Sequence, residues 1–183
     1  MRQVAKEAHA TFAVLLDILE LQSAREGTVV GAGHKGRYAP LAAIAPRLGY
    51  HRILALRPPL VLESLAQLGN NRLCTSVCGL LRALWTAASH DPEASWVPGT
   101  VQDTSTALID GPDALRANLA AHVLPLLFGI HPGACAALLA ALDSQGAGAP
   151  ATPDLQSARM AVLAAGHASG LVTWEKAASG GPP

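Results

Sequence analysis

The sequence is poor in charged residues. Only 14% of its 183 residues are Asp, Glu, Lys or Arg, where about a quarter is usual, and the formal net charge is zero. A chain without excess positive charge lacks the electrostatic footprint of a protein that binds nucleic acid or an anionic membrane, so we expect neither partner. Half of the residues are apolar, which excludes disorder for most of the chain. With so little charge to cover the surface, we expect either that apolar surface meets a partner or that the chain is a piece of something longer.

Long apolar runs and paired cysteines are also missing. Runs such as Ala134–Leu142 are far too short to cross a membrane, and the apolar run Phe12–Leu16 is interrupted by Asp17, unlike a signal peptide. The three cysteines are an odd number, which favours reduced thiols. These features predict a cytoplasmic protein.

What the chain does contain is helical periodicity. Apolar residues recur at steps of three and four, and the segments are separated by Gly, Pro or Asn. Ile53–Leu56 is short and ambiguous. We expect seven helices, at residues 3–24, 38–48, 60–68, about 71–88, 112 to the break at His131, 134–142 and 153 to about 168.

Three segments interrupt this pattern. Residues 89–112 are polar and rich in Pro, Gly, Asp and Thr, so we expect a mobile loop there. Residues 145–152 are expected to form a linker and residues 179–183 a flexible tail, which leaves one domain over residues 1–178. Trp96, in the expected loop, is a candidate contact for a partner, and a packed loop anchor is the alternative.

Helices that arrive in pairs of roughly 40 residues are typical of HEAT and armadillo arrays. We therefore expect an all-α fold, specifically a HEAT/armadillo-like α-solenoid segment. A compact helical bundle is the alternative architecture.

Four segments within residues 40–93 carry a resemblance to a known family. They are Pro46-Arg47-Leu48-Gly49-Tyr50-His51-Arg52, Leu65-Ala66-Gln67-Leu68-Gly69, Leu80-Leu81-Arg82-Ala83-Leu84-Trp85 and Pro92-Glu93. These segments resemble the helical-repeat region of focadhesin and its plant relatives. The similarity departs from the family pattern at Arg57-Pro58-Pro59, and at Arg52, where the family favours lysine. The resemblance implies a large cytoplasmic α-solenoid scaffold without known catalysis, linked to focal adhesions and to RNA decay, and it transfers no site residues.

A glycine-rich loop supports an alternative function. Gly31, Gly33 and Gly36 match the G-x-G-x-x-G pattern that lets a pyrophosphate approach the backbone at a helix N-terminus. Thr28–Val30 and Ile53–Leu56 would then be strands, and Arg57 would suit a 2′-phosphate. This pattern would make the chain a fragment of an NADP-dependent oxidoreductase.

Other groupings favour structural roles. Cys74 and Cys78 lie four apart, with His51 and His90 as possible neighbours, but no second paired motif completes a zinc site, so small buried thiols are expected. The arginines at positions 47, 52, 72 and 82 are interpreted as a modest basic edge on a solvated helix face.

No catalytic pattern emerges from these residues. We expect a non-enzymatic, protein-binding scaffold segment without catalytic residues, metal or cofactor. Trp96 is the partner-binding candidate, and the NADP-dependent oxidoreductase is the alternative.

Overall fold

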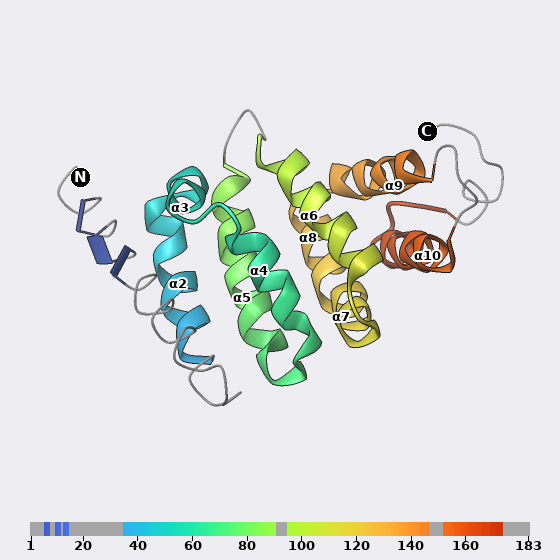
Figure 1. Ribbon diagram of the computed structural model, residues 1–183. Coiled ribbons are helices and arrows are strands. Elements are labelled where there is room, and N and C mark those ends of the chain that lie inside the picture. Colours follow the sequence, from blue (N-terminus) through green and yellow to red (C-terminus); the bar gives the residue numbers. More distant parts are fainter. Residues whose placement is uncertain are drawn as a thin grey trace.

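The computed structural model describes residues 35–90, 95–146 and 152–173, together with residues 6–7, 10–11 and 13–14. The described chain is all-helical and contains no strand, which confirms the all-α prediction. The helices follow one another along an extended row from α2 to α10 (Figure 1). They are α2 (Lys35–Leu48), α3 (Tyr50–Leu56), α4 (Leu60–Ala66), the 3₁₀ turn η2 (Gln67–Gly69), α5 (Asn71–Ala88), α6 (Trp96–Asp110), α7 (Asp113–Asn118), the π-helical turn η3 (Leu119–Val123), α8 (Leu124–Ile130), α9 (Gly133–Gln145) and α10 (Pro153–Ala168).

Two helices begin and end as their sequences predict. In α5, the side chain of Asn70 accepts a hydrogen bond from the backbone N–H of Arg72 (3.0 Å) and caps the helix. In α10, Thr152 caps the first turn by accepting from the backbone N–H of Leu155 (3.2 Å), and Pro153 fits the first helical position. The predicted inward face of α5, which includes Leu84 and Trp85, is completely buried.

The most extensive packing joins helices that are not adjacent along the chain. One succession is α2, α5 and α8, in which α5 contacts α2 on one side and α8 on the other. A second succession places α6 against α4 and against α9 and α10. The buried side chains form one hydrophobic core, in which leucine is the commonest residue.

The first described helix is longer than its periodicity indicates. It begins at Lys35, so Gly36 lies in a helix and not in the expected glycine-rich connector. Pro46 does not end the helix, which continues to Leu48. Gly49 does end it, with φ +83°, a left-handed conformation that favours glycine. The ambiguous segment Ile53–Leu56 belongs to α3, so it is not a strand.

The prediction of a mobile loop over residues 89–112 is wrong for most of this segment. Its larger part forms the fifteen-residue helix α6, and residues 91–94 lie outside the described chain. The inward face of α6 carries Trp96, Thr100, Thr104 and Ala107 at steps of three and four. Threonine methyl groups fill positions where leucine normally reveals a helix, and this substitution hides the periodicity from sequence inspection.

A widened helical turn lies directly before Pro125. The backbone N–H of Leu124 donates to the carbonyl of Leu119, five residues back, at the end of η3. Because Pro125 has no N–H to donate, the regular ladder is interrupted at this point, and the wide turn lies directly before it. The break separates α7 from α8 and changes the direction of the chain.

The N-terminal predictions lie largely outside the described residues. Six residues of the expected 3–24 helix are described, and all six are helical. Gly31, Gly33 and Thr28–Val30 lie outside the described chain, as do the expected tail and most of the 145–152 linker.

Candidate functional site

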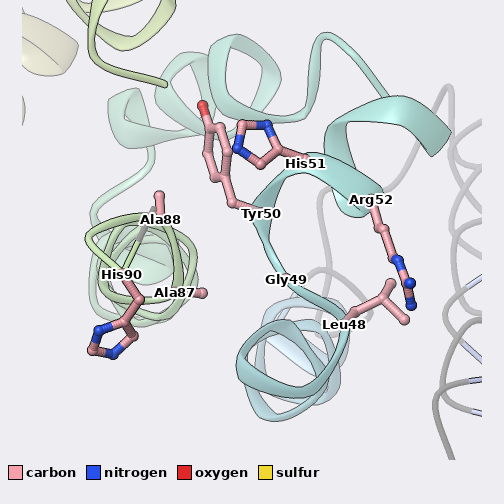
Figure 2. A pocket seen from close by; sticks show the side chains of 8 residues that line it. All are labelled: Leu48, Gly49, Tyr50, His51, Arg52, Ala87, Ala88 and His90. Atoms are coloured by element: carbon pink, nitrogen blue, oxygen red, sulfur yellow. The ribbon is translucent and has the colours of Figure 1, made fainter. Parts of the chain in front are cut away.

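A pocket of about 360 Å³ opens where the turn between α2 and α3 meets the end of α5 (Figure 2). The turn is made by Gly49, whose N–H donates to the carbonyl of Ala45 (3.0 Å) and whose positive φ redirects the chain into α3. The pocket is lined by Leu48, Gly49, Tyr50, His51, Arg52, Ala87, Ala88 and His90.

The pocket combines a small apolar floor with cationic or titratable groups. Ala87 and Ala88 are short side chains from the last turn of α5, and they leave the space open. His51, Arg52 and His90 are exposed to solvent, and none of the described residues that line the pocket is acidic. The charges of these lining residues therefore favour binding of an anionic group in the pocket.

The polar side chains do not converge on one point. In Figure 2, His51 lies beside Tyr50, Arg52 projects to one side, and His90 projects from the end of α5 on the other side. General acid–base or nucleophilic catalysis requires groups within hydrogen-bond reach of one reacting atom. Side chains spread in this way can instead contact several separate negative charges of a larger ligand.

A row of rings runs inward from this pocket. The ring centroids of His51 and Tyr50 are 5.7 Å apart, those of Tyr50 and Trp96 6.1 Å, and those of Trp96 and His131 5.6 Å, all in edge-on geometries. Edge-to-face contacts add to the stabilisation that burial of aromatic rings provides. The row joins α3, α6 and the end of α8 along one edge of the molecule.

Trp96 is therefore not an exposed partner contact. Only 3% of its surface is accessible, and it stands at the start of α6 between Tyr50 and His131. The prediction of a partner-binding side chain at this position is wrong, because the indole fills the core between consecutive helices. The alternative prediction, that Trp96 is packed in the interior, agrees with its burial, although Trp96 lies in a helix and not in a loop.

Burial keeps the Tyr50 phenol neutral. Desolvation raises its pKa above 10, the Thr100 hydroxyl beside it lowers the pKa in part, and the carboxylate of Asp103 raises it further. Burial also raises the pKa of Asp103. Thr100 Oγ1 is buried and makes no hydrogen bond of acceptable geometry within the described chain. Tyr50 is thus a packing residue and not a base.

The structure does not assemble the dinucleotide site. Of the three predicted glycines only Gly36 is described, and it lies in the first turn of α2. Arg57, the expected 2′-phosphate ligand, instead forms an ion pair with Glu63, with Nε 2.9 Å from Oε2 and a second contact of 3.0 Å. The strand expected at Ile53–Leu56 is a helix, so the second strand of the fingerprint is absent from this segment.

The three cysteines are free thiols, and Cys74 and Cys135 are buried. Burial raises the pKa of Cys78 to about 11, neighbouring Cys74 adds to the shift, and Arg82 lowers it in part. Within the described ranges no three His, Cys, Asp or Glu side chains are grouped so that they could hold a metal ion. The cysteines therefore occupy the positions expected of small packing residues.

Sequence inspection named His51 and His90 only as neighbours of the cysteines. It missed their common pocket, because the pocket joins two segments about forty residues apart through the Gly49 turn. The sequence features that could have indicated the pocket are Gly49, which ends α2, and the short side chains of Ala87 and Ala88 at the end of α5.

The chain matches no protein-family model, no curated protein and no solved structure. In the described part of the chain, no helix combines the length and the apolar character needed to cross a membrane.

Proposed function

We propose that this chain is a segment of a HEAT/armadillo-like α-solenoid that binds protein partners and does not catalyse a reaction. The observation that carries the proposal is the succession of helix contacts. Helix α5 lies between α2 and α8, and α6 lies between α4 and the pair α9 and α10. In a solenoid each repeat contacts its neighbours and together they present a continuous binding surface.

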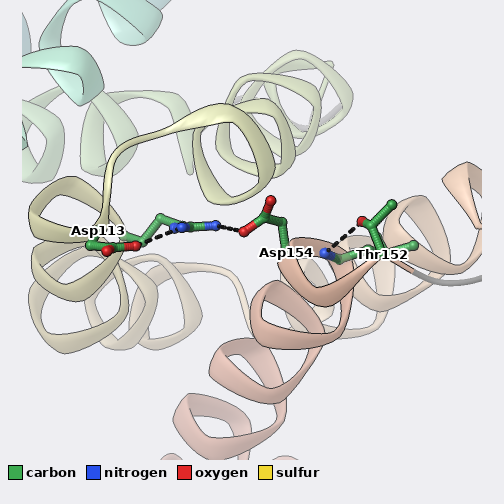
Figure 3. A network of polar contacts seen from close by, with 5 residues as sticks. Asp113, Thr152 and Asp154 are labelled. Carbon is green, nitrogen blue, oxygen red and sulfur yellow. Dashed lines mark hydrogen bonds and ion pairs between the residues drawn. The ribbon is translucent and has the colours of Figure 1, made fainter.

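Polar contacts also join elements that are not adjacent along the chain. Arg116 of α7 donates to Asp113 (2.6 Å) in its own helix and to Asp154 (2.5 Å) in α10 (Figure 3). Asn118 donates to the Leu68 carbonyl (2.7 Å), which ties the end of α7 to η2. These contacts hold α7 beside α10 and beside η2, and they support a scaffold whose helices keep their relative positions.

The resemblance of residues 40–93 to focadhesin-like repeats supports the same function and stays a prediction. The cytoplasmic location is a prediction of the same kind. The oxidoreductase alternative has no supporting geometry in the described residues, because they contain no strand and Arg57 is paired with Glu63.

The proposal is tested by quantitative affinity capture from a cytoplasmic extract, followed by titration of the purified partner against the chain. A helical bundle of the same size serves as the control bait. We expect at least one partner that binds the chain and not the control, with saturable micromolar or tighter affinity. Failure of every captured protein to bind in purified form would contradict the proposal.

A further inference from the structure

The zero net charge conceals a strong separation of charge along the chain. Residues 35–90 contain seven lysines and arginines and a single acid, Glu63. Residues 95–173 contain five aspartates and two arginines. The part of the chain that forms α2 to α5 is therefore basic, and the part that forms α6 to α10 is acidic.

The two halves differ also in how their charges are used. Three of the five aspartates are engaged: Asp113 and Asp154 with Arg116, and Asp143 with Arg159 (3.0 Å). On α5 the situation is the opposite. Both arginines of that helix are exposed, and neither forms an ion pair with an acid of the described chain. Among the residues whose side chains the structure describes, α5 therefore carries two arginines whose charge no acid of that set neutralises.

The exposed face of α5 is a single stripe at helical spacing. It consists of Arg72, Thr75, Gly79, Arg82 and Thr86. The two arginines are about 15 Å apart along the helix axis, and short residues separate them. A partner can therefore approach the helix backbone between the two guanidinium groups without meeting a long side chain.

The stripe leads directly to the pocket. His90 follows the last turn of α5, and His51 and Arg52 stand across the pocket from it. We call these residues together the basic track, defined as Arg72, Thr75, Gly79, Arg82 and Thr86 together with the pocket residues His51, Arg52 and His90. His90 connects the two groups, because it follows Thr86 by four residues and also lines the pocket.

We propose that the basic track binds an acidic peptide segment of a partner protein. The inference rests on the proposed protein-binding function and names the chemistry of the partner. Guanidinium groups bind carboxylates through two parallel hydrogen bonds, which makes arginine well suited to this partner. Since α5 is about 27 Å long, roughly eight residues of extended peptide would cover it.

Nucleic acid fits the track less well. Single strands bind where bases stack on exposed aromatic rings. The aromatic residues with a described environment, which are Tyr38, Tyr50, Trp85, Trp96 and Phe128, are all buried.

A membrane surface fits less well for a similar reason. The exposed large apolar side chains of the described residues are Val14, Leu62, Met160 and Leu171, and none of them lies on α5 or lines the pocket. The track itself offers no apolar side chain that could enter a bilayer beside its charges.

The test uses a fluorescein-labelled deca-glutamate peptide as the probe and fluorescence anisotropy at low ionic strength. We expect saturable binding that weakens as salt rises, because exposed charges are screened. A labelled deca-lysine peptide should not bind. In the double variant R72Q/R82Q binding should weaken at least five-fold, and R52Q should weaken it less.

The matched control is the double variant Q102E/Q156E, which changes the net charge by the same amount on exposed positions of α6 and α10. It should bind the peptide as the unmodified chain does. Equal loss in both double variants would show a general attraction of charge and overturn the proposal. Circular dichroism verifies that each variant remains folded.

Two further probes separate the other anionic partners. Labelled oligo-dT and phosphatidylserine vesicles are titrated under the same conditions. Tighter binding of either probe than of the peptide, lost in R72Q/R82Q, would overturn the choice of partner. Absence of peptide binding alongside a purified partner that binds the chain would refute the basic track and leave the scaffold function intact.

Discussion

The indole of Trp96 meets the imidazole of His131 edge-on, with ring centroids 5.6 Å apart and planes inclined by 68°. The contact joins the start of α6 to the residue that follows α8. Tyr50 contacts the other side of the same indole. Trp96 therefore links helices on both sides of α6.

Trp96→Ala should accordingly destabilise the protein. Removing a buried large aromatic ring costs about 3–5 kcal/mol of unfolding free energy. Urea denaturation followed by circular dichroism measures the loss. Exposed Thr86→Ala is the control and should change stability by less than about 0.5 kcal/mol. A loss at Trp96 no larger than the control would place the ring outside the core.

Thr104→Val should leave stability unchanged or raise it by up to about 1 kcal/mol. Thr104 Oγ1 is fully buried without a hydrogen-bond partner in the described chain, so the substitution removes an unsatisfied hydroxyl at nearly constant shape. Ser64→Ala is the contrasting variant, because the Ser64 hydroxyl donates to the Leu60 carbonyl (2.6 Å). It should lose about 0.5–1.5 kcal/mol. Both values come from chemical denaturation, and a clear loss at Thr104 would reveal a partner for its hydroxyl.

Gly49→Ala should lower the free energy of unfolding by about 1–2 kcal/mol, because alanine disfavours the backbone conformation of this position. An added Cβ at Gly49 meets nothing within 4 Å, but its φ of +83° is unfavourable for alanine. Gly79→Ala provides the matched control in the middle of α5, where the added Cβ is also unopposed and φ is helical. That substitution should stabilise by about 0.5–1 kcal/mol. Thermal unfolding of the pair would show shifts of opposite sign, and shifts of the same sign would disprove the turn geometry.

Cys78 should react slowly with iodoacetamide below pH 10. Its pKa is raised from 9.0 to about 11, so at pH 8 only about 0.1% is the reactive thiolate. The unfolded chain loses the thiol proton first, so the contribution to stability is complete below pH 9 and declines between pH 9 and about 11. Site-resolved mass spectrometry of alkylation across pH 7–11 measures the profile.

The control for Cys78 is Arg82→Gln. Removing the positive charge that lowers the thiol pKa should move the reactivity profile to higher pH. A midpoint near 9 in the unmodified chain would be inconsistent with the burial of this thiol.

Leu41→Ala should loosen one end of the molecule and not the other. Leu41 is buried in α2, which packs mainly against α5 and α3, so the cavity costs about 2–5 kcal/mol locally. In an array whose helices contact only neighbours, amide hydrogen exchange should rise in α2 and α5 and stay constant in α9 and α10. A uniform rise over all described helices would favour the compact helical bundle.

The helices that sequence predicted well have strong local signals. The leucine periodicity of α5 and a cap at Asn70 or Asn71 predict that helix, and Pro153-Asp154 predicts the start of α10, where Thr152 supplies the capping side chain. Helix α6 was missed because threonine and alanine form its inward face and because Pro98-Gly99 in its first turn resembles a loop. A threonine counts as polar in a sequence pattern, although its methyl group can pack in a core as Thr100 and Thr104 do in α6.

The pocket was less predictable than the helices. His51 and His90 meet only because Gly49 turns the chain and because α5 packs against α2. Such a meeting depends on packing between segments, and periodicity within a segment carries no information about it. The burial of Trp96 was unpredictable for the same reason, since its neighbours Tyr50 and His131 come from distant segments.

The separation of charge between the two halves makes the molecule an electric dipole. The sequence isoelectric point is about 7.1, so at that pH the whole chain carries no net charge and composition predicts weak retention on an ion exchanger. Adsorption depends on the face presented to the resin, and the chain can rotate to present α5. A sulfonate column run at pH 7.1 and low ionic strength should therefore retain the protein, and R72Q/R82Q should elute at lower salt.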